Sequence, residues 1–446
     1  MVSRVQNYSF FGNYSSAPGG KIQIIHQGVP LLRRVGLYAA SPRLRLRAFR
    51  SHPSRTGCKS IATAPRHKAT PIWLVLKIQL SLYKESSYKD QHSTIKHMKK
   101  ILVIRFRRVG DSVISVAICT SLKKSFPDAR IDYVLNDNIA CLYENHPDID
   151  RIIAFTDEEN HHFLKYIAKV WRLMRTEKYD IIIDTRSTIK TMFFSLFSLS
   201  TPYRIGTRKR YNILVHNHRV DNHSDNSIDM VRHNVMFLMP LSKEGKISYS
   251  TDFSLYISED SKATFKNYMT SRGIDFKKPV IFATVTARLI HKVWDKERMK
   301  EILKRIIDQY DAQVIFNFSA GVEEEFALAI HSEMNNDPHI STNIKAGSLK
   351  ELAALTSNCD FFFGNEGGPR HIAQAFSIPS YAIFPPNTIK AVWLPNMGER
   401  YNGISPDDIV SPEQQESMDY LQRFNLITVD DVWNGLKPML DRYIAN

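Results

Sequence analysis

From residue 98 onward the chain alternates short apolar runs, rich in Ile, Val and Phe, with longer stretches of helical periodicity. Parallel strands cannot be joined by a tight turn and need a crossover connection, which is usually a helix. An alternation of this kind therefore indicates βαβ units and parallel sheets. We expect an α/β fold.

The alternation restarts near residue 280, after a first series that ends with a helical pattern. We therefore expect two doubly wound domains, residues 98–275 and 276–446, joined near 272–280 and facing a cleft. Ligands of such sheets bind at the carboxyl ends of the strands. The predicted strands are 101–105, 131–135, 180–184, 251–257, 280–284, 313–318, 361–363 and 381–384; the predicted helices are 112–125, 161–177, 190–199, 261–272, 296–310, 323–334, 348–356 and 370–376.

The net charge of +15 lies almost entirely in residues 1–97, which hold 16 Lys and Arg side chains and two acids. This segment is rich in Arg, Ser, Gly and Pro and has no sustained periodicity, so we expect it to be disordered. The remaining chain is nearly neutral. The basic composition is therefore no argument for nucleic-acid binding by the predicted domains.

Three explanations of residues 1–97 compete: an organellar transit peptide, a basic tail for membrane or nucleic acid, and a start codon assigned too far upstream. We favour the third, because Met98-Lys99-Lys100 directly precedes the first predicted strand. On this interpretation a chain that starts at Met98 folds and works like the full chain.

The cysteine spacing argues against a disulfide-stabilised fold and a structural zinc site, and the hydropathy pattern argues against a transmembrane helix. Cys58, Cys119, Cys141 and Cys359 are far apart and form no C-x-x-C pair, which fits a reducing compartment. There is no uninterrupted apolar run of about 18 residues and no signal-peptide pattern. We expect a cytoplasmic protein. We expect no metal site and no cofactor.

The first candidate site follows the first predicted strand, where Gly110-Asp111-Ser112 opens a helix. Gly110 permits backbone conformations that other residues avoid, and Asp111 would face the ligand crevice. Asp and Ser are also common N-caps of helices, and the sequence alone leaves that structural role for Asp111 or Ser112 equally open.

The second candidate site lies between the strand 280–284 and the helix 296–310, and includes Thr286, Arg288 and Lys292. Arg and Lys beside a helix N-terminus suit a diphosphate. The alternative, which spacing alone favours, is a solvated basic loop with Trp294 packed beneath it.

The third candidate site follows the apolar run 361–363 and contains Glu366, Gly367, Gly368 and His371 at the start of a helix. Paired glycines allow a ligand to approach the backbone closely, and a helix N-terminus attracts anions. No G-x-G-x-x-G follows the first strand and no G-x-x-x-x-G-K-[ST] occurs, so a dinucleotide oxidoreductase and a P-loop ATPase are disfavoured.

In this order, three segments resemble glycosyltransferase family 9, the heptosyltransferases of lipopolysaccharide core assembly. They are ILVIRFRRVGDSVISVAICTSLKKSFPDARIDYV, TARLIHKVWDKER and FFFGNEGGPRHIAQAFSIPSYAIFPPN. The resemblance covers about residues 98 to 440. It implies a GT-B fold of two Rossmann-like domains, with the acceptor in the first and the nucleotide-sugar in the second.

The resemblance also implies an inverting transfer without a metal. It assigns Asp111 as the base that takes the acceptor proton, and Lys292 as the cation that neutralises the donor diphosphate. The remaining implied residues are Thr286, Arg288, Glu366, Gly367, Gly368 and His371 for the donor, and Gly110, Arg208, Lys209 and Arg210, with Arg204 nearby, for the acceptor.

The donor side departs from the family pattern. Glu366 stands where Asp is usual, Gly367 where Thr is usual, and Phe384-Pro385-Pro386-Asn387 where Gly-Pro-Thr is more typical. ADP-heptose is the expected donor, but these changes leave the sugar and the nucleotide open.

The resemblance predicts a bacterial, monomeric glycosyltransferase that moves heptose or a related sugar to a lipopolysaccharide core or another lipid-linked cell-surface glycan. A peripheral contact with the inner membrane is left open, and solvated loop charge is the alternative for Arg204–Arg210. Two other functions stay open: a nucleotide-sugar epimerase of similar fold, and a non-catalytic nucleotide-sugar-binding protein.

Overall fold

The computed structural model describes residues 100–445 except 107 and 222–225. The expectations for residues 1–97 lie outside the described residues. In the described part, no helix is both long and apolar enough to span a bilayer.

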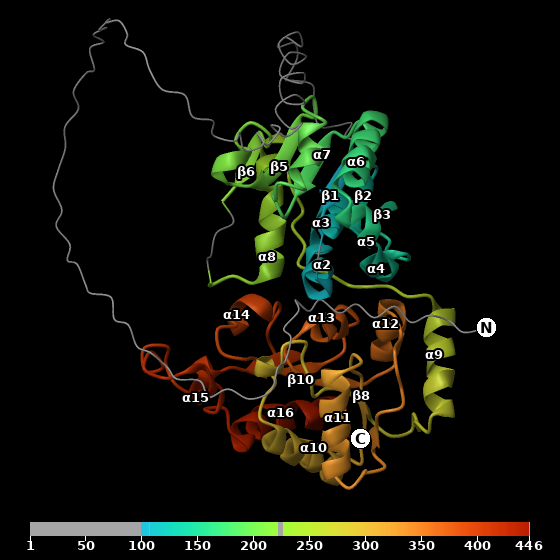
Figure 1. Ribbon diagram of the computed structural model, residues 1–446, viewed down its shortest axis with the longest axis vertical. Helices are drawn as coiled ribbons and strands as arrows, with labels where there is room; N and C mark the ends of the chain where they lie inside the picture. Colours follow the sequence, from blue (N-terminus) through green and yellow to red (C-terminus); the bar gives the residue numbers. More distant parts are fainter. Residues whose placement is uncertain (1–99, 107, 222–225, 446) are drawn as a thin grey trace, which may run out of the picture. The chain divides into compact units, whose positions relative to one another are not determined.

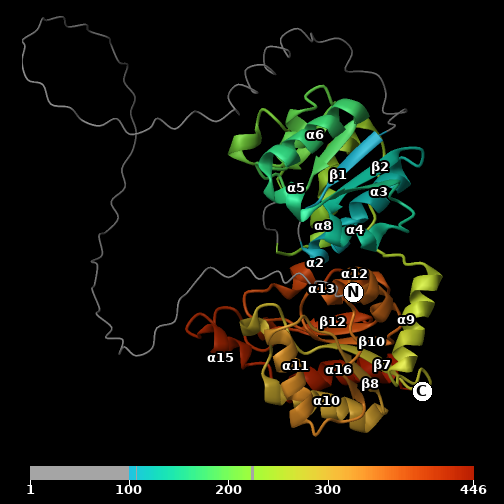
Figure 2. The same cartoon turned by 45° about the vertical axis from the view of Figure 1, so that its right-hand side comes forward.

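The described chain contains two parallel sheets of six strands each (Figures 1 and 2). The first has the order β3-β2-β1-β4-β5-β6 and the second the order β12-β11-β10-β7-β8-β9. Counted within each sheet, both follow the order 3-2-1-4-5-6 of the Rossmann fold. The prediction of a doubly wound α/β protein is confirmed. The strands are β1 Lys100–Ile104, β2 Arg130–Asn136, β3 Arg151–Phe155, β4 Ile181–Asp184, β5 Tyr203–Thr207, β6 His218–Val220, β7 Val280–Thr284, β8 Gln313–Phe316, β9 Ile340–Ser341, β10 Phe361–Asn365, β11 Ser380–Ile383 and β12 Tyr401–Ile404.

Helices connect the strands and cover the sheets, whose central strands are buried on both faces, as parallel sheets require. The first series is α2 Val109–Ser115, α3 Ala117–Ser125, α4 Asp137–Ala140, α5 Asp157–His161, α6 Phe163–Glu177, α7 Met192–Leu196 and α8 Met230–Val235, with 3₁₀ turns η2 Cys141–Tyr143, η3 Arg210–Asn212 and η4 Met236–Glu244. The second series is α9 Glu259–Ser271, α10 Lys296–Tyr310, α11 Val322–Glu333, α12 Leu349–Ser357, α13 Gly368–Ala375, α14 Lys390–Trp393, α15 Tyr420–Phe424 and α16 Val429–Tyr443, with η5 Ile290–Lys292 and η6 Pro406–Asp408.

Two predicted elements differ most from the structure. The helix expected at 112–125 is two helices that meet at Val116. The helix expected at 161–177 is confirmed as α6, and the short helix α5, which a capping box of Thr156 and Glu159 starts, precedes it. No strand forms at 251–257, because this segment lies beside helices and not beside a strand. Ser250 N donates to Ser121 Oγ of α3, and Leu255 N donates to the Ala375 carbonyl of α13.

Helix α9 packs against the second sheet although it precedes residue 275. Its Phe265 and Met269 share a buried cluster with Phe282 of β7 and Phe362 of β10. The domain boundary at 275/276 stays a prediction, and any division of the chain has to keep α9 with the second sheet.

The largest hydrophobic cluster of the described residues contains side chains from both halves of the chain. Val113 and Val116, next to the first sheet, pack in one cluster with Ala353 of α12 and with Ile372 and Ala375 of α13. Helices α2 and α13 lie side by side (Figures 1 and 2). The two sheets are therefore linked by a continuous apolar core as well as by the chain.

Candidate functional site

Asp111 lies in the first turn of α2, directly after β1, and forms an ion pair with Arg105. Arg105 Nη2 lies 3.1 Å from Asp111 Oδ1, and the two side chains are 6% and 11% exposed. Neither Asp111 nor Ser112 caps the helix: the N-cap is Arg108, and the Ser112 hydroxyl donates to the Val109 carbonyl. The capping alternative is therefore wrong, and Asp111 is a nearly buried carboxylate paired with Arg105.

The sequence does not mark Arg105 as a site residue, because it stands at the last position of the predicted strand 101–105. Its Nη1 lies 3.4 Å from Thr185 Oγ1, and its Nε finds no hydrogen-bond partner among the described residues. Arg108, which precedes α2, has a φ of 37°, which costs energy in a residue other than glycine. Such strain is common at functional sites.

Gly110 is required by a close contact between helices. A Cβ at this position would lie 2.7 Å from His371 Cδ2 and 3.5 Å from the Gly368 Cα atom. Only a residue without a side chain lets α2 approach the start of α13 so closely. The predicted acceptor residue Gly110 and the predicted donor residues Gly368 and His371 are therefore neighbours.

Glu366 follows β10 and lies close to charged groups from three segments. Its side chain is 13% exposed, and its Oε1 atom lies 3.8 Å from His371 Nε2. Burial raises the pKa of Glu366, against the positive charges of Arg370 and Lys292, and the negative charge of Asp111 adds to the rise. Lys292 and Asp111, which come from the other two candidate sites, are thus near enough for their charges to act on the pKa of Glu366.

His371 and Arg370 are both buried in the first turns of α13. Burial, with the neighbouring charge of Arg370, holds the pKa of His371 well below its ordinary value, so the imidazole is neutral. Burial also lowers the pKa of Arg370 to about 10, which leaves it charged at neutral pH. Arg370, which the sequence analysis did not select, donates to Gln374 Oε1 at 2.9 Å and to the Trp393 carbonyl.

The glycine that the backbone requires in this segment is Gly364, which lies in β10 before the predicted pair Gly367 and Gly368. Gly364 has a φ of 133°, and a Cβ there would lie 2.4 Å from the Thr284 carbonyl oxygen. At Gly367, which is extended, a Cβ would meet only Pro369 Cδ at 3.7 Å. A side chain therefore fits at Gly367, which agrees with its being a position that differs from the family pattern.

Between β7 and α10 the residues divide into buried anchors and accessible cations. Trp294 is 1% exposed, and its backbone N donates to Asn365 Oδ1, so the expected tryptophan beneath the loop is confirmed. Thr286 is buried and donates to Glu323 Oε2 at 3.2 Å. Arg288 is exposed and Lys292 is half-buried. Lys292 is the cation of this loop that acts on Glu366.

The alternative that the basic run 204–210 is solvated loop charge does not hold for its first part, because residues 203–207 form β5. Arg204 is buried there and donates to the Val215 and Leu199 carbonyls at 2.8 and 2.6 Å, so it holds the fold together. Arg208 and Arg210 are exposed. Lys209 Nζ lies 3.3 Å from the Arg186 carbonyl.

A buried carboxylate and imidazole at the end of β4 were not predicted. Asp184 Oδ1 accepts from the backbone N of Arg186 and Ser187, while Oδ2 lies 3.7 Å from His216 Nε2. Burial raises the pKa of Asp184 to about 6 and lowers that of His216 to about 4. At neutral pH the pair is mostly a carboxylate beside a neutral imidazole.

Within residues 100–445, gaps excepted, no three His, Cys, Asp or Glu side chains gather as metal ligands would. Asp150, part of a D-x-D sequence, accepts from Lys123 Nζ at 3.0 Å and from Ile131 N at 2.8 Å. It therefore has a structural role in this loop.

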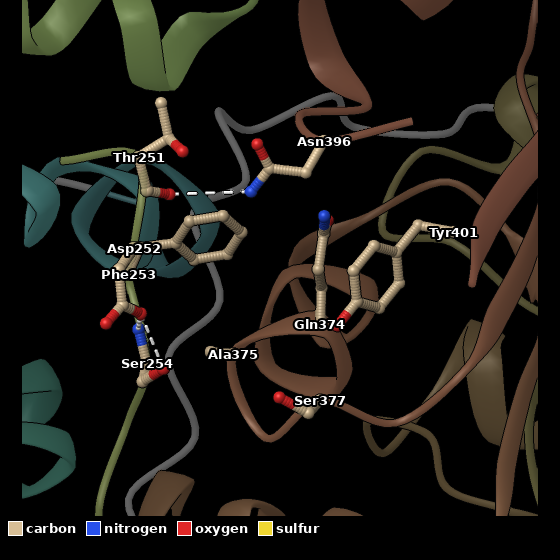
Figure 3. Close-up of a pocket in the computed structure, with 9 residues that line it drawn as sticks. All are labelled: Thr251, Asp252, Phe253, Ser254, Gln374, Ala375, Ser377, Asn396 and Tyr401. Carbon is tan, nitrogen blue, oxygen red and sulfur yellow. Dashed lines mark hydrogen bonds between the residues drawn. The ribbon is translucent and has the colours of Figure 1, made fainter. Parts of the chain in front are cut away.

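A small pocket of about 90 Å³ lies apart from the predicted residues (Figure 3). It is bordered by the segment that precedes α9, by the end of α13 and by the loop after α14, from which Asn396 Nδ2 lies 3.4 Å from the Thr251 carbonyl. Its polar lining and small volume suit water. It is lined by Thr251, Asp252, Phe253, Ser254, Gln374, Ala375, Ser377, Asn396 and Tyr401.

Comparison with known proteins gives consistent matches. The model of glycosyltransferase family 9 (heptosyltransferase) matches residues 167–420. Lipopolysaccharide heptosyltransferase 3 of Escherichia coli K12 is 23% identical over 285 residues, which cover 62% of this chain and 79% of that protein.

Two solved structures have the same fold. A family 9 glycosyl transferase from Veillonella parvula has a TM-score of 0.67 at 17% identity and covers 78% of this chain and 100% of its own. The E. coli heptosyltransferase WaaC, solved with ADP-2-deoxy-2-fluoro heptose, has a TM-score of 0.55 at 15% identity and covers 76% of this chain and 99% of its own. The predicted GT-B fold is confirmed.

Proposed function

The chain belongs to glycosyltransferase family 9, and we propose that it transfers heptose or a related sugar from ADP-heptose to a lipopolysaccharide core or other lipid-linked cell-surface glycan. The transfer inverts the anomeric centre and needs no metal or cofactor. The observation that carries this proposal is the close packing of Gly110, which precedes Asp111, against His371 and Gly368, because it sets the start of α2 beside the start of α13.

Asp111 acts as the general base. The acceptor hydroxyl gives its proton to the Asp111 carboxylate while its oxygen forms a bond to the anomeric carbon, and the bond from that carbon to the diphosphate breaks. The Arg105 guanidinium lies 3.1 Å from this carboxylate and holds it in place.

Lys292 and Arg288 stabilise the leaving group. The nucleoside diphosphate gains negative charge as the glycosidic bond breaks, and a cation placed beside it lowers the energy of the transition state. Lys292 is half-buried and acts on Glu366, so its charge lies next to the loop assigned to the donor. Thr286, at the end of the neighbouring β7, completes this side of the site.

The loop Glu366–Gly368 and His371 hold the donor, and Gly110 lies where acceptor and donor meet. The neutral His371 offers a hydrogen bond without adding charge to a site that already contains Lys292 and Arg370. The basic residues after β5, Arg208, Lys209 and Arg210, bind anionic groups of the acceptor. The enzyme works as a cytoplasmic monomer.

A nucleotide panel tests the proposal. Thermal shifts are measured with ADP, UDP and GDP and with their sugars, since a ligand of the native state raises its stability. We expect ADP-heptose to give the largest shift, and release of ADP to require an acceptor. Release of nucleotide without any acceptor would support an epimerase, and binding without turnover a non-catalytic protein. A larger shift with UDP- or GDP-sugars would change the donor and keep the mechanism.

A further inference from the structure

The connection between β5 and β6 presents apolar side chains to solvent beside a run of basic residues. In Arg208-Lys209-Arg210-Tyr211-Asn212-Ile213-Leu214, which we call the basic–apolar loop, Tyr211, Ile213 and Leu214 are 52%, 58% and 75% exposed. Ile189, in the loop after the neighbouring strand β4, is 67% exposed. Exposed apolar side chains that gather in one place indicate an interaction site.

The loop is firmly anchored, so these side chains are not exposed because the segment is loose. Asn212 is fully buried, and its Nδ2 lies 2.8 Å from the Thr207 carbonyl and 3.1 Å from His216 Nδ1. Tyr211 Oη donates to the Ser187 carbonyl at 2.8 Å, which ties the loop to the segment that carries Ile189. The fold therefore holds Ile213 and Leu214 outward.

The charge of the loop matches an anionic surface. Three consecutive cations precede the apolar residues, and the acid paired with Arg208, Asp221, lies 3.8 Å away in an exposed pair that is weak in water. Lys209 Nζ lies 5.7 Å from the Tyr211 ring centre. Lys, Arg and Tyr next to aliphatic side chains form the composition of segments that lie in the interface of a bilayer.

The position of the loop relates it to the reacting groups. It follows the carboxyl end of β5, Ile189 follows that of β4, and Asp111 follows that of β1. Strands β1, β4 and β5 are adjacent, so these segments lie along one edge of one sheet, with two strand spacings, about 10 Å, between the first and the last.

We propose that the basic–apolar loop docks this protein on an anionic lipid bilayer, with Ile213, Leu214 and Ile189 at the boundary between headgroups and acyl chains. The inference rests on the proposed function in one respect: a lipid-linked acceptor in the same bilayer would present its sugar to Asp111 from that surface. Docking itself needs neither donor nor acceptor.

Vesicle sedimentation of the full chain tests this, without donor or acceptor. The probes are phosphatidylcholine vesicles and vesicles with about one-third phosphatidylglycerol. We expect binding to the anionic vesicles that weakens at high salt, because the loop charges are screened there. The double variant Ile213→Ser/Leu214→Ser should bind at least about tenfold more weakly, because each aliphatic side chain gains free energy when it leaves water.

Leu421→Ser is the matched control, because Leu421 is 66% exposed on α15 and lies outside the loop. It should bind like the unaltered chain. Equal binding to both kinds of vesicle, no loss in the double variant, or an equal loss in Leu421→Ser would overturn the proposal. So would self-association or protein binding that the double variant abolishes while vesicle binding stays the same.

The proposed function is tested separately with a delipidated, water-soluble acceptor. The double variant should transfer sugar to it at the rate of the unaltered chain. Vesicle binding without any transfer would contradict the proposed function and leave the docking inference standing. Transfer without any vesicle binding would contradict the docking inference and leave the proposed function standing.

Discussion

Arg105 and Asp111 form an ion pair between the end of β1 and the first turn of α2, with 3.1 Å between Nη2 and Oδ1 and little exposure of either side chain. The carboxylate that we propose as the base is thus held by a guanidinium from its own loop. A buried pair of this kind is costly to break from one side, because the remaining charge is left without a partner.

Arg105→Ala should lower the free energy of unfolding by about 3 kcal/mol, because it leaves Asp111 buried and unpaired. The double variant Arg105→Ala/Asp111→Ala should lose less than the sum of the two single variants. Urea unfolding of all four chains measures the coupling. The exposed pair Lys437–Asp441, 2.6 Å apart, is the control, and Lys437→Ala should cost less than about 1 kcal/mol. Additive losses at Arg105 and Asp111 would refute a coupled pair.

Asp111→Asn should lower kcat at least about a hundredfold, since the amide cannot accept the acceptor proton. Binding of the donor, followed by thermal shift, should persist because the contacts of Lys292 remain. Asp148→Asn makes the same chemical change in the D-x-D sequence and should keep nearly full activity. Unchanged turnover in Asp111→Asn would refute the proposed base. A large loss in Asp148→Asn would show that the effect is not specific to Asp111.

Gly110→Ala should destabilise the protein by about 1–3 kcal/mol, the usual range for overpacking, because its Cβ would lie 2.7 Å from His371 Cδ2. Since that contact joins the proposed acceptor and donor loops, kcat should fall with it. Gly398→Ala is the control, as a Cβ there meets nothing within 4 Å. The prediction fails if the two alanine variants unfold at the same urea concentration.

Asp184→Asn should change how stability depends on pH. The pKa of Asp184 is raised from 3.8 to about 6, so between these values the folded chain holds a proton that the unfolded chain has released. The unfolding free energy contributed by this group therefore falls as pH rises through this window, by about 3 kcal/mol in total, and stays low above it. Relative to the unaltered chain, the Asn variant should gain that amount between about pH 3.5 and pH 7.

The contribution of His216 to the free energy of unfolding changes with pH in the opposite direction. Its pKa is lowered from 6.5 to about 4, so it destabilises the fold as pH falls between those values. Because both chains keep His216, its contribution largely cancels in the difference between them. Asp128→Asn, an exposed carboxylate, gives the baseline. A difference between Asp184→Asn and the unaltered chain that does not vary with pH would contradict the assignment.

Lys292→Ala should weaken ADP binding roughly tenfold or more, since charge-assisted contacts to phosphate contribute about 1.5–3 kcal/mol. Calorimetric titration measures it. Lys304→Ala removes an exposed lysine from α10, away from the donor loop, and should bind ADP normally. Equal affinities of the two variants would remove Lys292 from the diphosphate site.

The sequence predicts elements well where local signals agree. Helix α10 occupies the predicted residues 296–310, since Asp295 caps it and one face is apolar. Strand β7 also matches its predicted bounds of 280–284. The helix expected at 112–125 divides at Val116, and nothing in its local periodicity marks that break. The short strands β6 and β9 are too brief for a pattern to reveal.

For the site, the sequence reveals residues next to strand ends and misses those whose partners are distant. Asp111, Lys292 and Glu366 stand out because each interrupts an apolar or glycine-rich junction. Arg105 and Arg370 look like ordinary strand and helix positions, and only the folded chain shows that both are buried. The contact of Gly110 with His371 spans more than half of the described chain, so no local rule could predict it.

The apolar cluster that joins Val113 and Val116 to Ala353, Ile372 and Ala375 has a consequence for building hybrid enzymes. A hybrid that takes its donor half from one relative and its acceptor half from another would cut through this cluster. The exposed loops could be exchanged freely, but the facing surfaces of α2, α12 and α13 would have to come from the same parent. Any gain of a new donor by recombination is therefore limited by whether these few apolar side chains still pack against one another.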